Sequence, residues 1–349
     1  MNIKKTPVTI QDVANRAKVS IKTVSRVINS EPNVAEKTIK KVEKAIDFLD
    51  YQPNAFAQSL ARSQPKIIAL IYNTPSPNYI THVMEGVLSY CYKFGYEVII
   101  HPCRFDDASL IDDTKLFIKK SRVSGIITTP PLSDFPELIN QLDKLNMPKI
   151  LVSSGLVVDA SEKVNTNDYE ASFEITNHLI RRGHKRIGFI KGNPSHLCVN
   201  QRFAGFFDAM KEANLVCEGE LIETGLNSFA SGEICAKRLL NLKNRPSAVF
   251  AANDEMAAAV VKVANQLSID IPGSLSVVGF DDTPMTQMIS PALTTVHQPL
   301  FKMGEAAANK LICNLENTSY EGDDDIKSCL LYTSPSPRDR LLSRMPSSA

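Results

Sequence analysis

Apolar residues recur at helical spacing through the first fifty residues, and the pattern predicts three helices. The first helix follows Thr9, which forms a capping-box pattern with Asp12. A tight turn, "KVS", separates it from the second helix, which Ser20 can cap. The third covers "VAEKTIKKVEKAIDFL" (34–49), where Ala35 stands in place of a capping Ser or Thr. The residues expected on the buried faces are Val13, Ala14, Ala17, Val24, Val27, Ile28, Ile39, Val42, Ile46 and Leu49.

The second predicted helix, "SIKTVSRVIN" (Ser20–Asn29), has two unlike faces. Its apolar side can bury, while Lys22, Ser25, Arg26 and Asn29 face outward and Thr23 lies at the edge. A polar helix face is most often only solvated, so this pattern alone does not decide its role. Two short helices joined by a tight turn and followed by a longer one form a helix-turn-helix, whose second helix lies in the major groove of DNA.

From Lys66 onward the pattern changes to buried strands that alternate with helical segments. Alternation of this kind predicts parallel sheets covered by helices on both faces. Two successive sets of strands predict two similar lobes, with a ligand site in the cleft at the carboxyl ends of the strands. The predicted strands are "IIALIYN", "YEVIIHPC", "GIITTPP" and "KILVSSG" in the first set, and "RIGFIKG", "LIETG", "AVFAAND" and "LSVVGFDD" in the second.

Composition adds a charge asymmetry to this picture. The 349 residues suffice for two or three domains, and 43% hydrophobic with 22% charged residues is ordinary for a globular protein. The net charge is only +1, yet residues 1–62 hold eleven Lys or Arg against six Asp or Glu, a local charge of +5 that leaves −4 for the remainder. A basic amino-terminal module indicates an electrostatic task of its own, such as binding DNA.

The cysteines and the amino-terminal sequence indicate in which cellular compartment the protein is expected. None of the seven cysteines is in Cys-x-x-Cys spacing, which favours reduced thiols over a disulfide framework or a zinc site. The stretch "MNIKKTPVTIQDVANRA" has no apolar signal core, and no segment is long enough to span a bilayer. We therefore expect a cytoplasmic, nucleoid-associated protein that does not bind a membrane.

The amino-terminal motifs resemble a known family. "TIQDVA", "VSIKTVSRVIN" and "YQPNAFAQSLA" occur in the order and spacing typical of lactose-repressor/galactose-repressor (LacI/GalR) transcription regulators. The resemblance implies that the outward face of Ser20–Asn29 reads bases, and that residues 52–64 form a hinge helix whose Leu60 enters the minor groove. The DNA-binding residues implied are Thr9, Ser20, Ile21, Lys22, Thr23, Ser25, Arg26, Asn29, Tyr51, Asn54, Ala57 and Leu60.

The resemblance continues through the core to about residue 327, in "RRGHKRIGFIKG", "NDEMAAAVV" and "GFDDTPMTQMISPALTTVHQP". It implies a periplasmic-binding-protein-like core of two doubly wound lobes. The domains expected are a helix-turn-helix headpiece (1–51), a hinge (52–64) and an effector-binding and dimerisation core (65–328), whose chain crosses between lobes near 165 and 293.

Polar residues at strand ends supply the candidate effector site. The positions that match Arg202, Asn253 and Asp281 contact the effector in the family, and such groups suit sugar hydroxyls. Ser153, Asn227 and Leu300 occupy positions that are often Asp or aromatic in sugar-binding members, which predicts a roomier and more polar pocket for an oligosaccharide or a glycoside. We expect Asp254 and Asp282 to cap the helices that follow them rather than to bind the effector.

The chain carries no catalytic signature that we could place, and its six histidines are dispersed, each expected to be structural or at the surface. We therefore expect no enzymatic activity, cofactor or metal site. The segments together indicate a repressor of carbohydrate-use genes that binds a pseudo-palindromic operator as a homodimer and responds to a sugar or glycoside. An activator or a corepressor-dependent regulator is the alternative. A sugar carrier is a remote one, because it would need an export signal and no helix-turn-helix.

The last segment, "CLLYTSPSPRDRLLSRMPSSA" (329–349), lacks strand alternation, and its prolines, serines and arginines break regular elements. One reading frame of the sequencing-library adapter TGTCTCTTATACACATCT encodes "CLLYTS", and "PSPRD" continues into the adjoining primer. We therefore predict that this segment is not native, that it packs against nothing, and that the final strand expected beside the first lobe is missing. A disordered native tail is the alternative.

Overall fold

A computed structural model of the chain describes residues 8–28, 34–51, 65–73, 76–322 and 326–331. The chain divides into two compact units, Met1–Pro65 and Lys66–Ala349, which are described separately below and are called the headpiece and the core. The described residues include no helix that is both long enough and apolar enough to cross a membrane.

The headpiece contains the three predicted helices, α1 (Ile10–Ala17), α2 (Ile21–Ile28) and α3 (Glu36–Leu49). They enclose a small apolar core in which Val13, Val24 and Val42 have no exposed surface. The other predicted apolar positions are buried in this core or packed around it, except Ile39, which is half-buried outside it. The periodicity therefore predicted the buried faces of all three helices.

Local capping fixes where the first two helices begin. The Thr9 hydroxyl and backbone N–H both donate to Asp12 Oδ2, at 2.7 and 2.8 Å, which confirms the predicted pairing. Hydrogen bonds from Thr9, first from its side chain and then from its backbone, lower the pKa of Asp12. Ser20 Oγ accepts the Thr23 N–H at 3.1 Å, so Ser20 caps α2 as predicted. Ala35 precedes α3 without a side-chain cap.

Removing the Thr9 cap is expected to loosen α1. In Thr9→Ala the carboxylate of Asp12 loses the hydroxyl donor, which should cost about 0.5–2 kcal/mol, as for other cap residues. Hydrogen exchange of the α1 amides in the full chain measures this, with Thr9→Ser as the matched control because it keeps the hydroxyl. Unchanged exchange in Thr9→Ala would mean that tertiary packing alone holds the start of α1.

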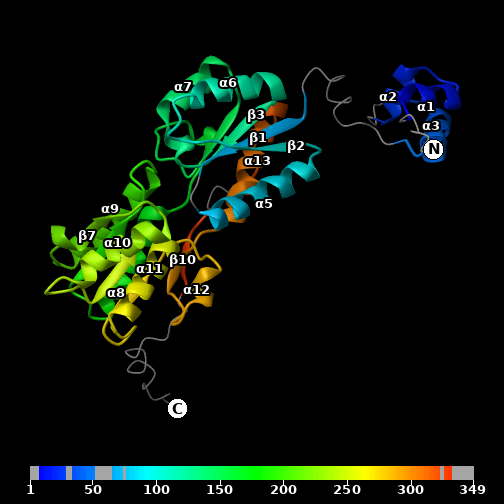
Figure 1. Cartoon of the computed structure of the whole chain (residues 1–349). Coiled ribbons are helices and arrows are strands. Elements are labelled where there is room, and N and C mark those ends of the chain that lie inside the picture. The colour runs from blue at the N-terminus through cyan, green and yellow to red at the C-terminus, as the bar shows by residue number, and fades with distance from the viewer. Residues whose placement is uncertain (1–7, 29–33, 52–64, 74–75, 323–325, 332–349) are drawn as a thin grey trace, which may run out of the picture. The chain divides into compact units, whose positions relative to one another are not determined.

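The first lobe of the core is a five-stranded parallel sheet with strand order β2-β1-β3-β4-β5. Figure 1 shows β1, β2 and β3 between α5 and α13 on one side and α6 and α7 on the other. The apolar side chains of the sheet's strands alternate between two clusters, one beneath α5 and α13 and the other beneath α6 and α7. The elements are β1 (Ile67–Tyr72), α5 (Pro77–Lys93), β2 (Glu97–Pro102), α6 (Leu110–Ser121), β3 (Gly125–Thr128), η1 (Leu132–Asp134), α7 (Pro136–Lys144), β4 (Lys149–Val152), η2 (Ala160–Glu162), β5 (Lys163–Val164) and, much later in the chain, α13 (Leu300–Glu316).

The second lobe repeats this plan with a four-stranded parallel sheet of order β7-β6-β8-β9. One large cluster that contains Phe189, Phe206 and Phe250 fills it. The elements are α8 (Asp168–Arg181), β6 (Ile187–Lys191), α9 (Cys198–Glu212), η3 (Gly219–Leu221), β7 (Ile222–Thr224), α10 (Phe229–Leu240), β8 (Ala248–Ala251), α11 (Asp254–Gln266), β9 (Ser276–Val278), α12 (Met285–Met288) and β10 (Thr295–His297). The two sets of strands therefore form the two lobes that the alternation predicted.

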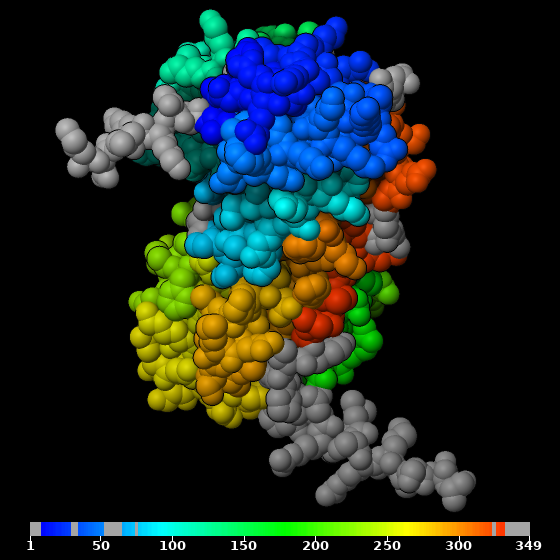
Figure 2. Space-filling model, turned by 90° about the vertical axis from the view of Figure 1, so that its right-hand side faces the viewer, coloured from blue at the N-terminus to red at the C-terminus, as the bar shows by residue number. Residues whose placement is uncertain are grey.

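Helix α13 returns the chain to the first lobe, where it packs along α5. The contact is close enough that a Cβ on Gly86 would lie 2.0 Å from the Phe301 carbonyl oxygen, and one on Gly304 would lie 2.1 Å from that of Val83. Glycine at both positions therefore lets the two backbones touch. Figure 2 shows the cyan region of α5 beside the orange region of α13 on one face of the core.

In the part of the core that the structure describes, the chain passes between the lobes three times, once more than predicted. It leaves the first lobe between β5 and α8, as predicted near 165, but it returns between β10 and α13, a few residues after the predicted position near 293. The third passage leads from Ile326, which packs on the first lobe, to β11 (Cys329–Leu331), which pairs antiparallel with β10.

The strand β11 corrects the prediction for the last segment. Leu330 pairs with Val296 and packs on the core of the second lobe, so the expectation that this segment packs against nothing is wrong for Cys329–Leu331. This strand lies beside the second lobe, where it pairs with β10. Its three residues are too short for an alternation to be visible in the sequence. Residues 332–349 lie outside the described part of the chain.

Candidate functional site

The outward face of α2 is the candidate DNA-reading surface of the headpiece. Ile21 is 43% exposed and Lys22 is exposed, while Thr23, Ser25 and Arg26 are half-buried around the edge of the helix. An exposed isoleucine beside basic and hydroxyl side chains combines apolar, charged and polar contacts, which are those used on base edges. Ser20 and Thr23 also share a hydroxyl–hydroxyl hydrogen bond of 2.9 Å, which holds both at the start of the helix.

Of the other residues predicted to bind DNA, two are described by the structure and four are not. Thr9 is exposed at the cap of α1, and Tyr51 is half-buried against the headpiece core. Four predicted residues lie outside the described part of the chain: Asn29, Asn54, Ala57 and Leu60.

A cavity lies where the carboxyl ends of the strands of the two lobes face each other, which is the position that the parallel-sheet pattern predicted. Its wall combines one carboxylate, one guanidinium, three amides, an imidazole, two hydroxyls, a phenol and a thiol. The lining residues are Ser76, Tyr79, Pro130, Ser153, His196, Cys198, Val199, Arg202, Asn227, Asn253, Asp281 and Gln298.

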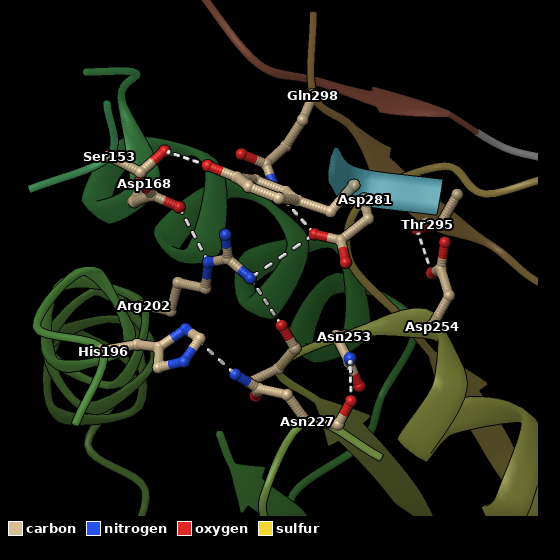
Figure 3. A network of polar contacts seen from close by, with 12 residues as sticks. Ser153, Asp168, His196, Arg202, Asn227, Asn253, Asp254, Asp281, Thr295 and Gln298 are labelled. Atoms are coloured by element: carbon tan, nitrogen blue, oxygen red, sulfur yellow. Dashed lines mark hydrogen bonds and ion pairs between the residues drawn. The ribbon is translucent and has the colours of Figure 1, made fainter. Parts of the chain in front are cut away.

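Arg202 lies at the centre of the polar network shown in Figure 3. Its Nε donates to Asp168 Oδ1 at 2.7 Å and its Nη1 donates to the Ala252 carbonyl at 2.6 Å, with Asp281 Oδ1 3.6 Å from the same Nη1. The guanidinium also lies 3.8 Å over the Phe280 ring. Burial opposes its charge, but the carboxylates of Asp168 and Asp281 outweigh this and raise the pKa of Arg202. Arg202 is therefore a fixed cation.

Asp281 faces the cavity from the end of β9. Gln298 Nε2 donates to its Oδ1 at 2.5 Å, so a side chain from beyond β10 orients the carboxylate. Burial raises the pKa of Asp281, and the charge of Arg202 opposes that rise. A buried carboxylate beside a cation retains acceptor capacity for hydroxyl or N–H donors of a ligand.

Two amides and an imidazole form the opposite wall. Asn253 caps α11 by accepting the Met256 N–H at 3.0 Å, and its Nδ2 donates to the Asn227 carbonyl at 3.1 Å. Asn227 Nδ2 lies 3.3 Å from His196 Nδ1. Burial, with a smaller contribution from Arg202, lowers the pKa of His196 to about 4, so the ring is neutral at pH 7. Among the described residues, the buried His196 Nε2 has no hydrogen-bond partner.

Two capping predictions are wrong. Asn253, rather than Asp254, caps α11, and the Asp254 carboxylate instead accepts the Thr283 N–H at 2.7 Å and the Thr295 hydroxyl at 2.6 Å. Asp282 contacts His297 Nδ1 at 2.9 Å, and the short helix α12 begins only after Pro284. Each carboxylate therefore ties a segment that follows a strand to residues in or near β10 instead of capping a helix.

Backbone strain is concentrated at the cavity. Ser153, Asn227 and Asp281 have φ values of 52°, 58° and 116°, and Asp282 has 59°. The remaining positive-φ residues other than glycine in the described chain follow helix ends, where this conformation is common. Non-glycine residues in such conformations cost energy and cluster at ligand sites. Three of the six predicted effector residues are thus distinguished by conformation as well as by position.

Leu300 is the predicted effector residue that does not line the cavity. It is 6% exposed at the start of α13 and packs in the apolar core of the first lobe. The other five, Ser153, Arg202, Asn227, Asn253 and Asp281, all line the cavity.

Sequence reasoning missed several cavity residues. His196 was expected to be structural or at the surface, yet it lines the cavity, as do Tyr79, Cys198 and Gln298. Tyr79 Oη lies 3.0 Å from Ser153 Oγ, and burial raises the pKa of its hydroxyl. The only signal available for these residues was their position shortly after a predicted strand or near the lobe crossing.

Comparison with known proteins identifies the families of the headpiece and of the core. Residues 9–54 match the model of bacterial regulatory proteins of the lacI family, and residues 176–339 match the periplasmic-binding-protein-like domain. The HTH-type transcriptional repressor PurR of Vibrio vulnificus is 34% identical over 318 residues, which cover 90% of this chain and 93% of that protein. PurR of Actinobacillus pleuropneumoniae is also 34% identical, over 317 residues with the same coverage.

Solved structures show the same architecture. The lac repressor dimer bound to operator and the anti-inducer ONPF is 25% identical with a TM-score of 0.82, and the match covers 94% of this chain and 99% of that chain. The transcriptional regulator CelR in complex with cellobiose is 25% identical with a TM-score of 0.72, covering 94% and 100%. The chain therefore belongs to the lacI family of bacterial regulatory proteins and is a DNA-binding transcription repressor.

Proposed function

We propose that the repressor binds a pseudo-palindromic operator as a homodimer and that a sugar-type effector in the interlobe cavity modulates its operator affinity. The observation that carries the effector assignment is the polar wall of the cavity. It presents Asp281, Arg202 and three amide side chains, and it includes the unpartnered Nε2 of His196. Closely spaced donors and acceptors suit the several hydroxyls of a carbohydrate.

DNA binding requires two copies, because one α2 face offers only a few base contacts. A two-fold dimer places two such faces on half-sites about one helical turn apart. The lac repressor structure similar to this chain is a dimer bound to operator, which supports the proposal. Effector binding would then shift the operator equilibrium through a coupling free energy between the two sites.

A purine base is the competing effector class, since the similar repressors carry the name PurR. A planar base binds best between apolar or aromatic faces. Among the lining residues, Tyr79 offers the one phenol ring on which a base could stack. Asn227 occupies a position where the family often has an aromatic residue. The wall thus favours hydroxyl-rich ligands over flat ones.

A thermal-shift panel of the full chain with monosaccharides, disaccharides, aryl glycosides and purine bases separates these classes. A ligand at a hundred times its Kd adds about 2.7 kcal/mol to the folded state, which gives a readily measured shift. We expect a carbohydrate to raise the Tm of the core. A rise with purines alone would replace the sugar assignment.

Asp281→Asn is expected to weaken binding of the carbohydrate found in that panel by about tenfold or more, because one charged acceptor is lost. Asparagine is preferable to alanine here, since it tolerates the positive φ of this residue. Calorimetric titration measures the affinity, and Asp112→Asn on the exposed face of α6 is the matched control. Equal affinities in all three proteins would show that Asp281 does not contact the effector.

A further inference from the structure

The two lobes touch through a carboxylate that is separate from the cavity wall. Asp134, at the end of η1 in the first lobe, is only 8% exposed. Its Oδ1 accepts the Gly155 N–H at 2.8 Å and the Ser154 hydroxyl at 3.1 Å, both within its own lobe. Its Oδ2 accepts the Leu197 N–H of the second lobe at 2.7 Å. One carboxylate thus joins the two lobes by hydrogen bonds to backbone groups.

The second-lobe partner of Asp134 is the start of helix α9. Leu197 immediately precedes α9, so its N–H is one of the free donors at the amino-terminal end of that helix. A carboxylate is favoured there by the helix dipole as well as by the hydrogen bond. The same helix carries Cys198, Val199 and Arg202 into the cavity. The contact with Asp134 therefore sets the distance between these side chains and the first lobe.

A second observation shows how closely the lobes meet at this point. A Cβ on Gly155 would lie 2.4 Å from the Leu197 Cβ and 3.3 Å from its carbonyl carbon. Even the smallest side chain at position 155 would force the lobes apart. Gly155 thus allows the close approach of the two lobes, and Asp134, which also accepts the Gly155 N–H, holds them there.

The cavity between the lobes measures about 40 Å³ in this closed arrangement. A single water needs about 10–15 Å³ measured in this way, so the closed cavity has room for only a few waters. That space is smaller than a sugar needs, so we expect the lobes to move apart when one binds. The group that holds the lobes together therefore controls access to the cavity.

We propose that Asp134 is an interlobe latch: a positioning residue that touches no effector but holds the cleft closed, so that its release precedes effector entry. The regulatory meaning of the latch rests on the proposed function, but the latch itself does not. Its test uses neither effector nor DNA, so its failure would leave the proposed function intact.

The chain contains a natural reporter of cleft opening. Cys198 lines the cavity one residue beyond the latch contact and is half-buried, and burial raises the pKa of its thiol to about 12, which slows its reaction while the cleft is closed. Cys91 and Cys235 are buried in the first and second lobes respectively, away from the cleft. Opening of the cleft exposes Cys198 alone, whereas unfolding exposes all three.

Asp134→Asn tests the hydrogen bond with almost no change in volume. Both first-lobe donors converge on Oδ1, so the amide oxygen takes that position and the amide nitrogen faces the Leu197 N–H. Two donors then face each other and the latch is lost. Gly155→Ala tests the same contact by the opposite means, because it leaves the carboxylate intact and adds a methyl group between the lobes.

The experiment is iodoacetamide labelling of the full chain, followed by peptide mass mapping of each cysteine. We expect both variants to label Cys198 about tenfold faster or more than wild type, with Cys91 and Cys235 unchanged. Asp112→Asn on α6 is the matched control and should label at the wild-type rate. Wild-type Cys198 rates in both variants would overturn the latch, as would parallel acceleration of all three cysteines, which indicates unfolding instead.

Discussion

Replacement of Arg202 by alanine is expected to destabilise the core by about 3–5 kcal/mol, the usual cost of removing one partner from a buried ion pair. The change leaves the carboxylates of Asp168 and Asp281 buried without their cation, and it leaves the Ala252 carbonyl without its donor. Both carboxylates are about as buried as Arg202 itself, so the few waters that the cavity can hold solvate them far less than bulk solvent would. An alanine variant therefore loses much more than an effector contact.

Thermal unfolding of the full chain measures this effect. For a unit of this size, the expected loss corresponds to a fall in Tm of roughly 6–20 °C. Arg104→Ala is the matched control, because Arg104 and its partner Asp106 are each 76% exposed and such pairs contribute about 0–1 kcal/mol. A Tm for Arg202→Ala equal to that of the control would show that the buried network is not a structural element of the core.

Arg26→Ala is expected to weaken binding to the preferred operator by about 1–3 kcal/mol, with a smaller loss on random DNA. Arg26 lies at the last turn of α2, on the helix whose outward face also carries Ile21 and Lys22. A guanidinium in the major groove can contact guanine O6 and N7 together, which a phosphate contact does not reproduce.

Fluorescence anisotropy with an operator selected from a random library, and with a random duplex, separates the two kinds of contact. Lys44→Ala on the exposed face of α3 is the matched control, since it removes a headpiece charge away from α2. Equal losses on both duplexes in Arg26→Ala would assign Arg26 to the phosphate backbone alone.

Local patterns predicted the headpiece and the strands well because their causes are local. The buried faces of α1, α2 and α3 follow from helical periodicity, and the cap pairs Thr9 with Asp12 three residues away. Ser153 follows β4 of the first lobe, and Asn253 and Asp281 follow β8 and β9 of the second; they meet in one cavity because the carboxyl ends of the two parallel sheets face each other.

The remaining errors all come from long-range geometry. Asp254 was expected to cap α11, but Thr283 and Thr295 reach its carboxylate from distant segments. Leu300 was expected in the cavity. Because α13 packs along α5, its Leu300 side chain lies in the apolar core of the first lobe instead. Asp134 showed no signal in the sequence, since its partner Leu197 is 63 residues away and donates through its backbone.

Control of the repressor through the interlobe cavity is measured most directly by the operator affinity of wild type and of Asp281→Asn, with and without the carbohydrate found in the thermal-shift panel. We expect the carbohydrate to change the wild-type operator Kd by about five- to 150-fold, the usual range of allosteric coupling, and to leave that of Asp281→Asn nearly unchanged. A wild-type Kd that does not respond, or a response of equal size in Asp281→Asn, would contradict an effector-controlled repressor with its regulatory site in this cavity.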